Sequence, residues 1–468
     1  ASMMIFALIA GLIALSWGGL ILFRGGLVAG CLLVLLAGSC FGSLFYNLPG
    51  GPMPLTSDRL LWCVLLAQYF VWRKFGLADP KPLTRTDLLL AAFLGVLAFS
   101  TVTHDWRLMN SMPASRLVFY YLMPVGMYWV ARQTRLTERS MTAVFASCGL
   151  FGVYLAVTGI AERRELWWAV FPGYIKNAEY TEFFGRARGP FLNPIGTGIF
   201  LCTCLCAGLM LWPRVGRLGR VALLATVGLT ALGVQSTMTR SVWMGLALSV
   251  GIVVALSLPR SWRLPILGGA TLAGLLLVAT QWESLLSFKR DKELSAEATA
   301  ESVQLRPILA TIAWNIFCDR PLLGVGFGQY KEVNVNYMSD RSTDLPLTKA
   351  RPYVQHNVFL SLLAETGLAG MGSFVALLGV WGWHAWQLWR LGDAPAWARS
   401  QGLLFLAVLG CYLPNGMFHE VSLIPMVNML LFFMAGLTEG LSLAYGPERR
   451  LTFIQFVRPQ HDRPMAPA

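Results

Sequence analysis

Charged side chains are scarce in this 468-residue sequence. Asp, Glu, Lys and Arg together make up 13% of the residues, whereas hydrophobic residues make up 56%. Soluble domains carry about 25% charged residues, so roughly half of the groups that normally face water are missing here. That much apolar surface does not fit inside an aqueous core. The deficit excludes an ordinary soluble protein and predicts a chain surrounded by lipid.

Several motifs of metal, redox and nucleic-acid chemistry are also missing. There is no CxxC pair and no cluster of His and Cys, which excludes the usual zinc and thiol redox sites. The net charge of +13 is spread over short clusters between apolar runs, which is unlike the single basic stripe of a nucleic-acid-binding surface. We therefore expect no metal, no cofactor and no nucleic-acid partner. Six of the nine cysteines lie in apolar runs, where they pack as small hydrophobes, namely Cys31, Cys40, Cys63, Cys202, Cys204 and Cys206.

Apolar windows long enough to cross about 30 Å of hydrocarbon recur along the chain. Because several are short or rich in glycine, we predict an all-α polytopic membrane protein of about twelve transmembrane helices, with twelve, thirteen and fourteen all compatible with the pattern. The windows are residues 3–22, 26–47, 60–76, 88–103, 117–131, 141–160, 194–213, 221–235, 242–258, 264–280, 368–389, 401–418 and 424–444.

Short loops rich in Lys and Arg orient these spans, since such loops stay in the cytoplasm. They occur in every second connection between spans, so all of them lie on the cytoplasmic side, and they place the C-terminus inside. They lie at residues 73–85, 132–139, 214–220, 260–263, 390–399 and in the tail. The polar stretches 161–193 and 281–367, with nearly balanced charge, then fall outside. Within the longer one, residues 293–318 have apolar positions at helical spacing, which predicts one or two helices along the membrane surface.

The predicted organisation has four parts. Residues 1–280 hold transmembrane helices and the shorter external loop at 161–193, and residues 281–367 form the long external segment. Residues 368–446 form the C-terminal transmembrane helices, and residues 447–468 form a cytoplasmic tail.

Three polar constellations fall on the external side. RARGPFLNP (186–194) carries Arg186 and Arg188, TMTRSVWMG (237–245) carries Arg240, and QHNVFLSLLAETG (355–367) carries His356 and Glu365. Ionisable groups at a membrane boundary are costly unless something compensates them. Guanidinium groups bind phosphate oxygens in bidentate fashion, and a neutral imidazole removes a proton from a hydroxyl. Together they suit a lipid-linked pyrophosphate leaving group that an alcohol displaces.

Structural interpretations of the same residues stand beside this one. An arginine at the end of a span commonly reaches for headgroups, and a histidine that opens a helix commonly caps it. Glu365 would then pair with a neighbouring span. The glycines at Gly324, Gly326 and Gly328 form a turn in this interpretation, because no strand-turn-helix unit surrounds them.

At these motifs the chain resembles the O-antigen ligase and polymerase superfamily of bacterial inner-membrane proteins. The resemblance runs from about Gly185 to Gly370, and the first 180 residues match in hydropathy alone. The matching elements are Arg188-Gly189 with Phe191 and Asn193-Pro194, Thr239-Arg240-Ser241 with Trp243 and Gly245, Pro321-Leu322-Leu323-Gly324-Val325-Gly326 with Tyr330, and His356-Asn357 with Phe359, Leu360 and Glu365-Thr366-Gly367.

The resemblance implies a metal-independent, inverting glycosyltransferase of the membrane-embedded GT-C type. Its donor would be an undecaprenyl-pyrophosphate-linked glycan and its acceptor a sugar of the lipid A core, with membrane lipids as further partners. His356 would activate the acceptor hydroxyl. The remaining roles it implies are donor pyrophosphate binding for Arg188, Arg240 and Arg186, and acceptor binding or support for Asn193, Tyr330, Asn357 and Glu365.

In the bacterial inner membrane, the resemblance places the active site at the periplasm. O-antigen polymerases and protein O-oligosaccharyltransferases share the motif region and remain alternatives, as does a lipid-linked glycan transporter in which the arginines line a pathway. We favour a ligase because one long external segment dominates and carries the histidine at its C-terminal end.

Overall fold

The computed structural model describes residues 18–19, 24–42, 45, 47–48, 55–108, 111–177, 179–280, 296–339, 343, 345–350 and 355–446. The predicted span at 3–22, apart from residues 18 and 19, and the predicted tail at 447–468 lie outside these residues.

Within the described residues, eight helices are long and apolar enough to cross a membrane. They confirm an all-α polytopic membrane protein, whereas the count of about twelve spans and the likeness to GT-C enzymes stay predictions. The eight are α4 (Arg85–Val102), α7 (Glu138–Arg163), α8 (Pro194–Leu209, whose span continues to Arg214), α9 (Arg217–Ser236), α10 (Arg240–Ser257), α15 (Val358–Arg390), α16 (Ala396–Phe418) and α17 (Pro425–Tyr445).

Shorter or less apolar elements complete the described part of the bundle. They are the π-helical η1 (Leu33–Ala37), α2 (Gly38–Cys40), α3 (Ser57–Lys74), α5 (Pro113–Leu117), the π-helical η2 (Val118–Leu122), α6 (Met123–Arg132), α11 (Arg260–Thr280), α13 (Ala296–Asp319), α14 (Tyr330–Val333) and the antiparallel pair β1 (Asn47–Leu48) and β2 (Leu55–Thr56). One-turn 3-10 helices fill the loops at Trp167–Ala169, Gly173–Lys176, Gly189–Phe191, Trp212–Arg214, Asn334–Tyr337, Leu347–Ala350 and Val421–Leu423.

The centre of the bundle is built from α8, α16 and α17. In their apolar stretches 83%, 72% and 89% of the residues are buried, against 17% in α9 and 28% in α10. A helix that is apolar on all sides belongs in the interior, and one whose apolar side chains remain exposed belongs at the lipid boundary. α9 and α10 therefore form part of the lipid-facing rim.

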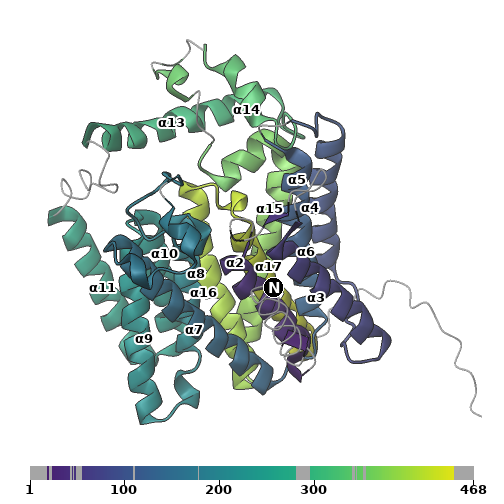
Figure 1. Ribbon diagram of the computed structural model, residues 1–468, viewed down its shortest axis with the longest axis vertical. Coiled ribbons are helices and arrows are strands. Elements are labelled where there is room, and N and C mark those ends of the chain that lie inside the picture. Colours follow the sequence, from purple (N-terminus) through teal and green to yellow (C-terminus); the bar gives the residue numbers. More distant parts are fainter. Residues whose placement is uncertain are drawn as a thin grey trace, which may run out of the picture.

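Helix α13 lies across one end of the bundle instead of running along it (Figure 1). It is a single helix over most of the segment predicted to lie on the membrane surface. Its inner face forms a small separate core with residues that follow it, made of Ile308, Leu309, Ile312, Ile316, Tyr330, Met338 and Leu347. We call this end of the molecule the α13 end; the arginine-rich loops mark the opposite end.

Helix α15 is interrupted at Gly367, which has φ 62°. The glycine-rich turn after α13 enters this interruption through four backbone hydrogen bonds, among them Val325 N to Ala364 O (3.0 Å) and Leu368 N to Pro321 O (2.8 Å). The backbones of these two segments approach so closely that a Cβ at Gly324 would lie 2.4 Å from the carbonyl carbon of Glu365. The interruption separates a short helix at the α13 end from the long span that follows.

Candidate active site

Arg188 lies in the loop between α7 and α8, and its side chain is fully buried. Its Nε donates to Glu162 Oε1 (2.9 Å), and its two terminal nitrogens donate to the backbone carbonyls of Tyr180, Glu182 and Ile175. Glu162 Oε2 also accepts from the backbone N–H of Arg188 (2.8 Å). All three guanidinium nitrogens are thus bonded to the protein, and the pair fixes the loop to the end of α7.

Arg186 ties the same loop to the turn between α9 and α10. Its Nε donates to Thr237 O (3.1 Å) and its Nη2 donates to Thr239 Oγ1. A backbone bond from Ala187 N to Ser236 O (3.0 Å) supports the contact. Helix α10 begins at Arg240, directly after Thr239. The loop at 186–188 therefore holds the start of that helix in place.

Arg240 is half-buried in the first turn of α10, at the α13 end. Helix α10 packs against α16, and Gly245 faces that helix closely enough that a Cβ there would lie 2.9 Å from Asn415 Nδ2. Arg240 precedes Gly245 by five residues and Phe418 follows Asn415 by three. At a rise of 1.5 Å per residue, Arg240 lies about 8 Å and Phe418 about 5 Å beyond this contact toward the α13 end. The two residues therefore lie at similar heights along the bundle.

Asn357, which follows His356, is hydrogen-bonded to the same end of α16. The Asn357 side chain caps α15 by accepting from Phe359 N (2.9 Å) and Leu360 N (3.0 Å), and its Nδ2 donates to Met417 O (2.8 Å). His356 precedes this cap with φ 50°, a backbone conformation uncommon outside glycine, and its side chain remains exposed. The cap thus projects the imidazole at the surface beside the end of α16.

The side chain of Arg306, which belongs to α13, lies at the end of α16 near His356. Its guanidinium carbon lies 5.2 Å from the centre of the Phe418 ring. Partial desolvation, and then the positive charge of Arg306, lowers the pKa of His356 below its ordinary value. The imidazole is therefore neutral at neutral pH, the form that accepts a proton.

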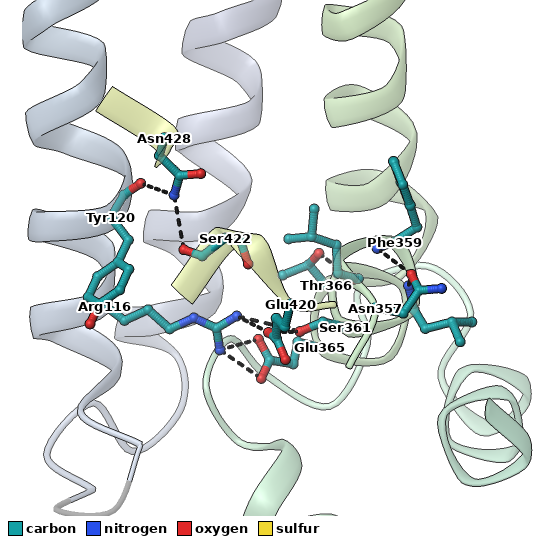
Figure 2. Close-up of polar contacts among 12 residues, drawn as sticks. Arg116, Tyr120, Asn357, Phe359, Ser361, Glu365, Thr366, Glu420, Ser422 and Asn428 are labelled. Atoms are coloured by element: carbon teal, nitrogen blue, oxygen red, sulfur yellow. Dashed lines mark hydrogen bonds and ion pairs between the residues drawn. The ribbon is translucent and has the colours of Figure 1, made fainter. Parts of the chain in front are cut away.

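Beneath this surface lies a buried ionic cluster, shown in Figure 2. Arg116 of α5 donates to both oxygens of Glu365 (3.0 and 2.9 Å) and to Glu420 Oε1 (3.0 Å), and Ser361 Oγ donates to the same Glu420 oxygen (2.6 Å). The cluster joins α5, α15 and the loop between α16 and α17. Burial and the nearby charge of Glu365 raise the pKa of Glu420, although Arg116 opposes this effect.

The cluster also fixes the orientation of the short helix that begins α15. Asn357, Ser361 and Glu365 recur every four residues, so they lie on one helix face. That face is bonded in turn to Met417 O, Glu420 and Arg116. The position of His356 at the start of this helix is therefore set by a row of hydrogen bonds and ion pairs along it.

The other predicted supporting residues occupy structural positions. Asn193 caps α8 by accepting from Ile195 N (2.9 Å) and Gly196 N (3.1 Å). Tyr330 is 1% exposed and belongs to the small core under α13. The structure thus brings Arg240 and His356 to the surface of the α13 end, while Arg186, Arg188 and Glu365 lie buried in contacts with the protein. Their predicted roles toward substrate stay predictions.

Four residues that complete this arrangement were not among the predicted site residues: Arg306, Arg116, Glu420 and Glu162. Each is an ionisable group next to an apolar run, which is the same signal that singled out Arg240. Their partners are far away in the sequence, as Arg116 and Glu365 are 249 residues apart. Glu420 could have been found from the sequence, because it directly follows another ionisable residue, His419. Arg306 could not, because it lies in a segment interpreted as a surface helix.

No three His, Cys, Asp or Glu side chains among the described residues are grouped so as to hold a metal ion.

Residues 224–375 match the model of the family described as O-antigen ligase. The match runs from α9 into α15, and it contains Arg240, Arg306 and His356 but not the loop at 186–188. A comparison with curated proteins finds no match. The family match confirms the resemblance stated from the motifs over residues 224–375, whereas the motif around Arg188 lies outside it.

Proposed function

We propose that this multi-pass membrane protein, a member of the O-antigen ligase and polymerase superfamily by its residues 224–375, is an O-antigen ligase. It transfers an O-antigen glycan from undecaprenyl pyrophosphate to the lipid A core oligosaccharide at the periplasmic face of the bacterial inner membrane. The observation that carries the proposal is the placement of Arg240, Arg306 and His356 around the end of α16.

The donor pyrophosphate needs positive charge at the membrane boundary. Arg240 and Arg306 supply two guanidinium groups there, and each binds phosphate oxygens in bidentate fashion. We assign the direct contact to these two residues. Direct donor binding by Arg188 would break its bonds to Glu162, so we assign to Arg186 and Arg188 the positioning of the loop that holds Arg240.

The acceptor step uses His356. The neutral imidazole accepts the proton of the acceptor sugar hydroxyl as that oxygen attacks the anomeric carbon of the donor. The new glycosidic bond forms as the bond between that carbon and the pyrophosphate oxygen breaks, which inverts the configuration. The negative charge that develops on the leaving pyrophosphate is stabilised by the two arginines, so the reaction proceeds without a metal ion.

The test is a transfer assay with purified protein, lipid-linked glycan and truncated lipopolysaccharide in the presence of a chelator. His356→Ala and Arg240→Ala abolish transfer, and Arg240→Lys is severely impaired because a point charge loses the bidentate contact. Arg320→Ala, an exposed arginine at the end of the same external segment, serves as the matched control and keeps normal transfer. Near-normal transfer by the His356 and Arg240 variants would reject the proposal.

The same assay separates the related functions. A ligase requires the lipopolysaccharide acceptor, whereas a polymerase extends the glycan when lipid-linked glycan alone is supplied. A protein O-oligosaccharyltransferase labels an acceptor protein in its place. Movement of lipid-linked glycan across vesicles without a new glycosidic bond would identify a transporter.

A further inference from the structure

A cavity of about 1150 Å³ lies at the end of the bundle opposite to His356. It is bounded by the start of α4, the last turns of α15 and the end of α17. Helix α15 links it to the candidate active site, and the part of α15 that follows Gly367, residues 368–390, spans about 35 Å. The cavity is therefore a separate site from the one around His356.

The lining of the cavity changes along α15. Near the helix ends it carries Arg85, Arg390 and Trp386, and further back along α15 it carries Ala376 and Gly379. Arginine and tryptophan at the ends of spans lie at headgroup level, and small apolar residues further along the helix face the hydrocarbon. From Arg390 to Ala376 the wall extends about 21 Å along α15, compared with about 15 Å for one leaflet. This profile matches one lipid molecule.

The charges of the cavity favour an anion. Glu439, the acidic residue of the lining, is 2% exposed and binds His384 Nδ1 through Oε1 (2.8 Å). Arg85 and Arg390 are exposed and form no ion pair with a carboxylate among the described residues. Arg85 moreover lies in the first turn of α4, where the helix dipole disfavours a cation. A bound phosphate would compensate both charges.

The deep part of the cavity is open beside Gly379. A Cβ at this glycine would meet no atom within 4 Å, and the same holds for Gly372, two turns away on the same helix but outside the cavity lining. A larger side chain at Gly379 therefore fills the cavity without displacing the protein. Gly372 provides a substitution of the same kind that leaves the cavity unchanged.

We propose that this cavity binds one anionic phospholipid from the leaflet opposite to the active site. Its phosphate lies between Arg85 and Arg390, and one acyl chain extends along Gly379 and Ala376. The inference is independent of the proposed transfer reaction, because it concerns a different end of the molecule.

The test is native mass spectrometry of delipidated full-length protein incubated with phosphatidylglycerol or phosphatidylcholine. We expect one phosphatidylglycerol to be retained at least tenfold better than phosphatidylcholine. Arg85→Gln combined with Arg390→Gln, and separately Gly379→Leu, reduces this retention at least tenfold. Two controls retain it: Lys74→Gln combined with Arg139→Gln, which removes two exposed charges outside the cavity, and Gly372→Leu.

Three outcomes would overturn the proposal. If phosphatidylcholine is retained as well as phosphatidylglycerol, the charge of the lipid has no role. If retention is unchanged in the cavity variants, the lipid binds elsewhere. Competition by glycerol 3-phosphate as strong as that of the intact lipid would show a phosphate site without a place for the acyl chain. Size-exclusion chromatography of every variant checks that lost retention is not lost folding.

Discussion

At the scale of single residues, the protonation of His356 sets the pH dependence of the proposed reaction. Its pKa is lowered, so the imidazole is neutral at pH 7 and becomes protonated only as the pH falls through that lowered value. We expect transfer to be constant near neutrality and to fall on the acidic side. Because Arg306 contributes to the shift, Arg306→Gln raises the pKa and moves the acidic limb to higher pH.

The measurement is a pH–rate profile of the residual activity of Arg306→Gln beside that of the unaltered protein. Arg320→Gln, which removes an exposed charge from the same segment, leaves the limb where it is. A limb that stays in place in Arg306→Gln would contradict the electrostatic contact between the two residues.

The pair formed by Arg188 and Glu162 is expected to act on stability. Both side chains are fully buried, and removing one partner leaves an uncompensated charge at a cost of about 3 to 5 kcal/mol. Arg188→Gln therefore lowers the thermal unfolding temperature markedly, and the double variant with Glu162→Gln recovers part of the loss. An Arg188→Gln protein that is inactive yet as stable as the unaltered one would favour direct donor binding instead.

The sequence was sufficient to single out Arg188, Arg240 and His356, because ionisable groups beside apolar runs stand out on energetic grounds. It was not sufficient to distinguish a substrate ligand from a buried ion pair. That distinction depends on Glu162 and Glu420, whose distances to their arginines are set by helix packing and not by any local pattern.

At the scale of elements, the interruption of α15 at Gly367 is expected to be essential for the site. A Cβ at this position would lie 2.4 Å from the carbonyl carbon of Leu322, and the positive φ adds strain. Gly367→Ala therefore separates the glycine-rich turn from α15, lowers the thermal unfolding temperature and reduces transfer severely, since Arg116 and Glu365 lose their alignment.

Gly372→Ala on the same helix provides the control. Its Cβ would meet open space, so the substitution stabilises the helix by about 0.5–1 kcal/mol and keeps transfer. Equal unfolding temperatures and equal activities of the two variants would show that the close approach at Gly367 has no role.

The same element shows how far hydropathy predicts structure. The apolar window 368–389 coincides with the part of α15 that follows the interruption, while the preceding turns, from Val358 to Thr366, were expected only as a helix opening at His356. A window of mean hydropathy detects the length of an apolar run. It does not detect the backbone bonds that the turn at Gly324 to Gly328 makes with a segment forty residues later.

At the scale of the whole molecule, the proposal depends on which end of the bundle faces the periplasm. The charge bias of the loops predicts that the α13 end lies on that side. Cys318 tests this directly, because it is an exposed cysteine near the end of α13, and Asp393 is an exposed residue in the loop between α15 and α16 at the opposite end. A membrane-impermeant maleimide added to intact spheroplasts should label Cys318 in a Cys63→Ser background.

In that background, Cys318→Ser combined with Asp393→Cys should become labelled only after the membrane is permeabilised. Thiols react as thiolates in water, so buried cysteines such as Cys202 and Cys204 stay silent in both variants. The reverse pattern would place Arg240, Arg306 and His356 in the cytoplasm, where no lipopolysaccharide acceptor with a periplasmic core is presented. In that orientation the arrangement at the end of α16 would have to serve a different acceptor, and the assignment as a ligase would fail even though the fold is unchanged.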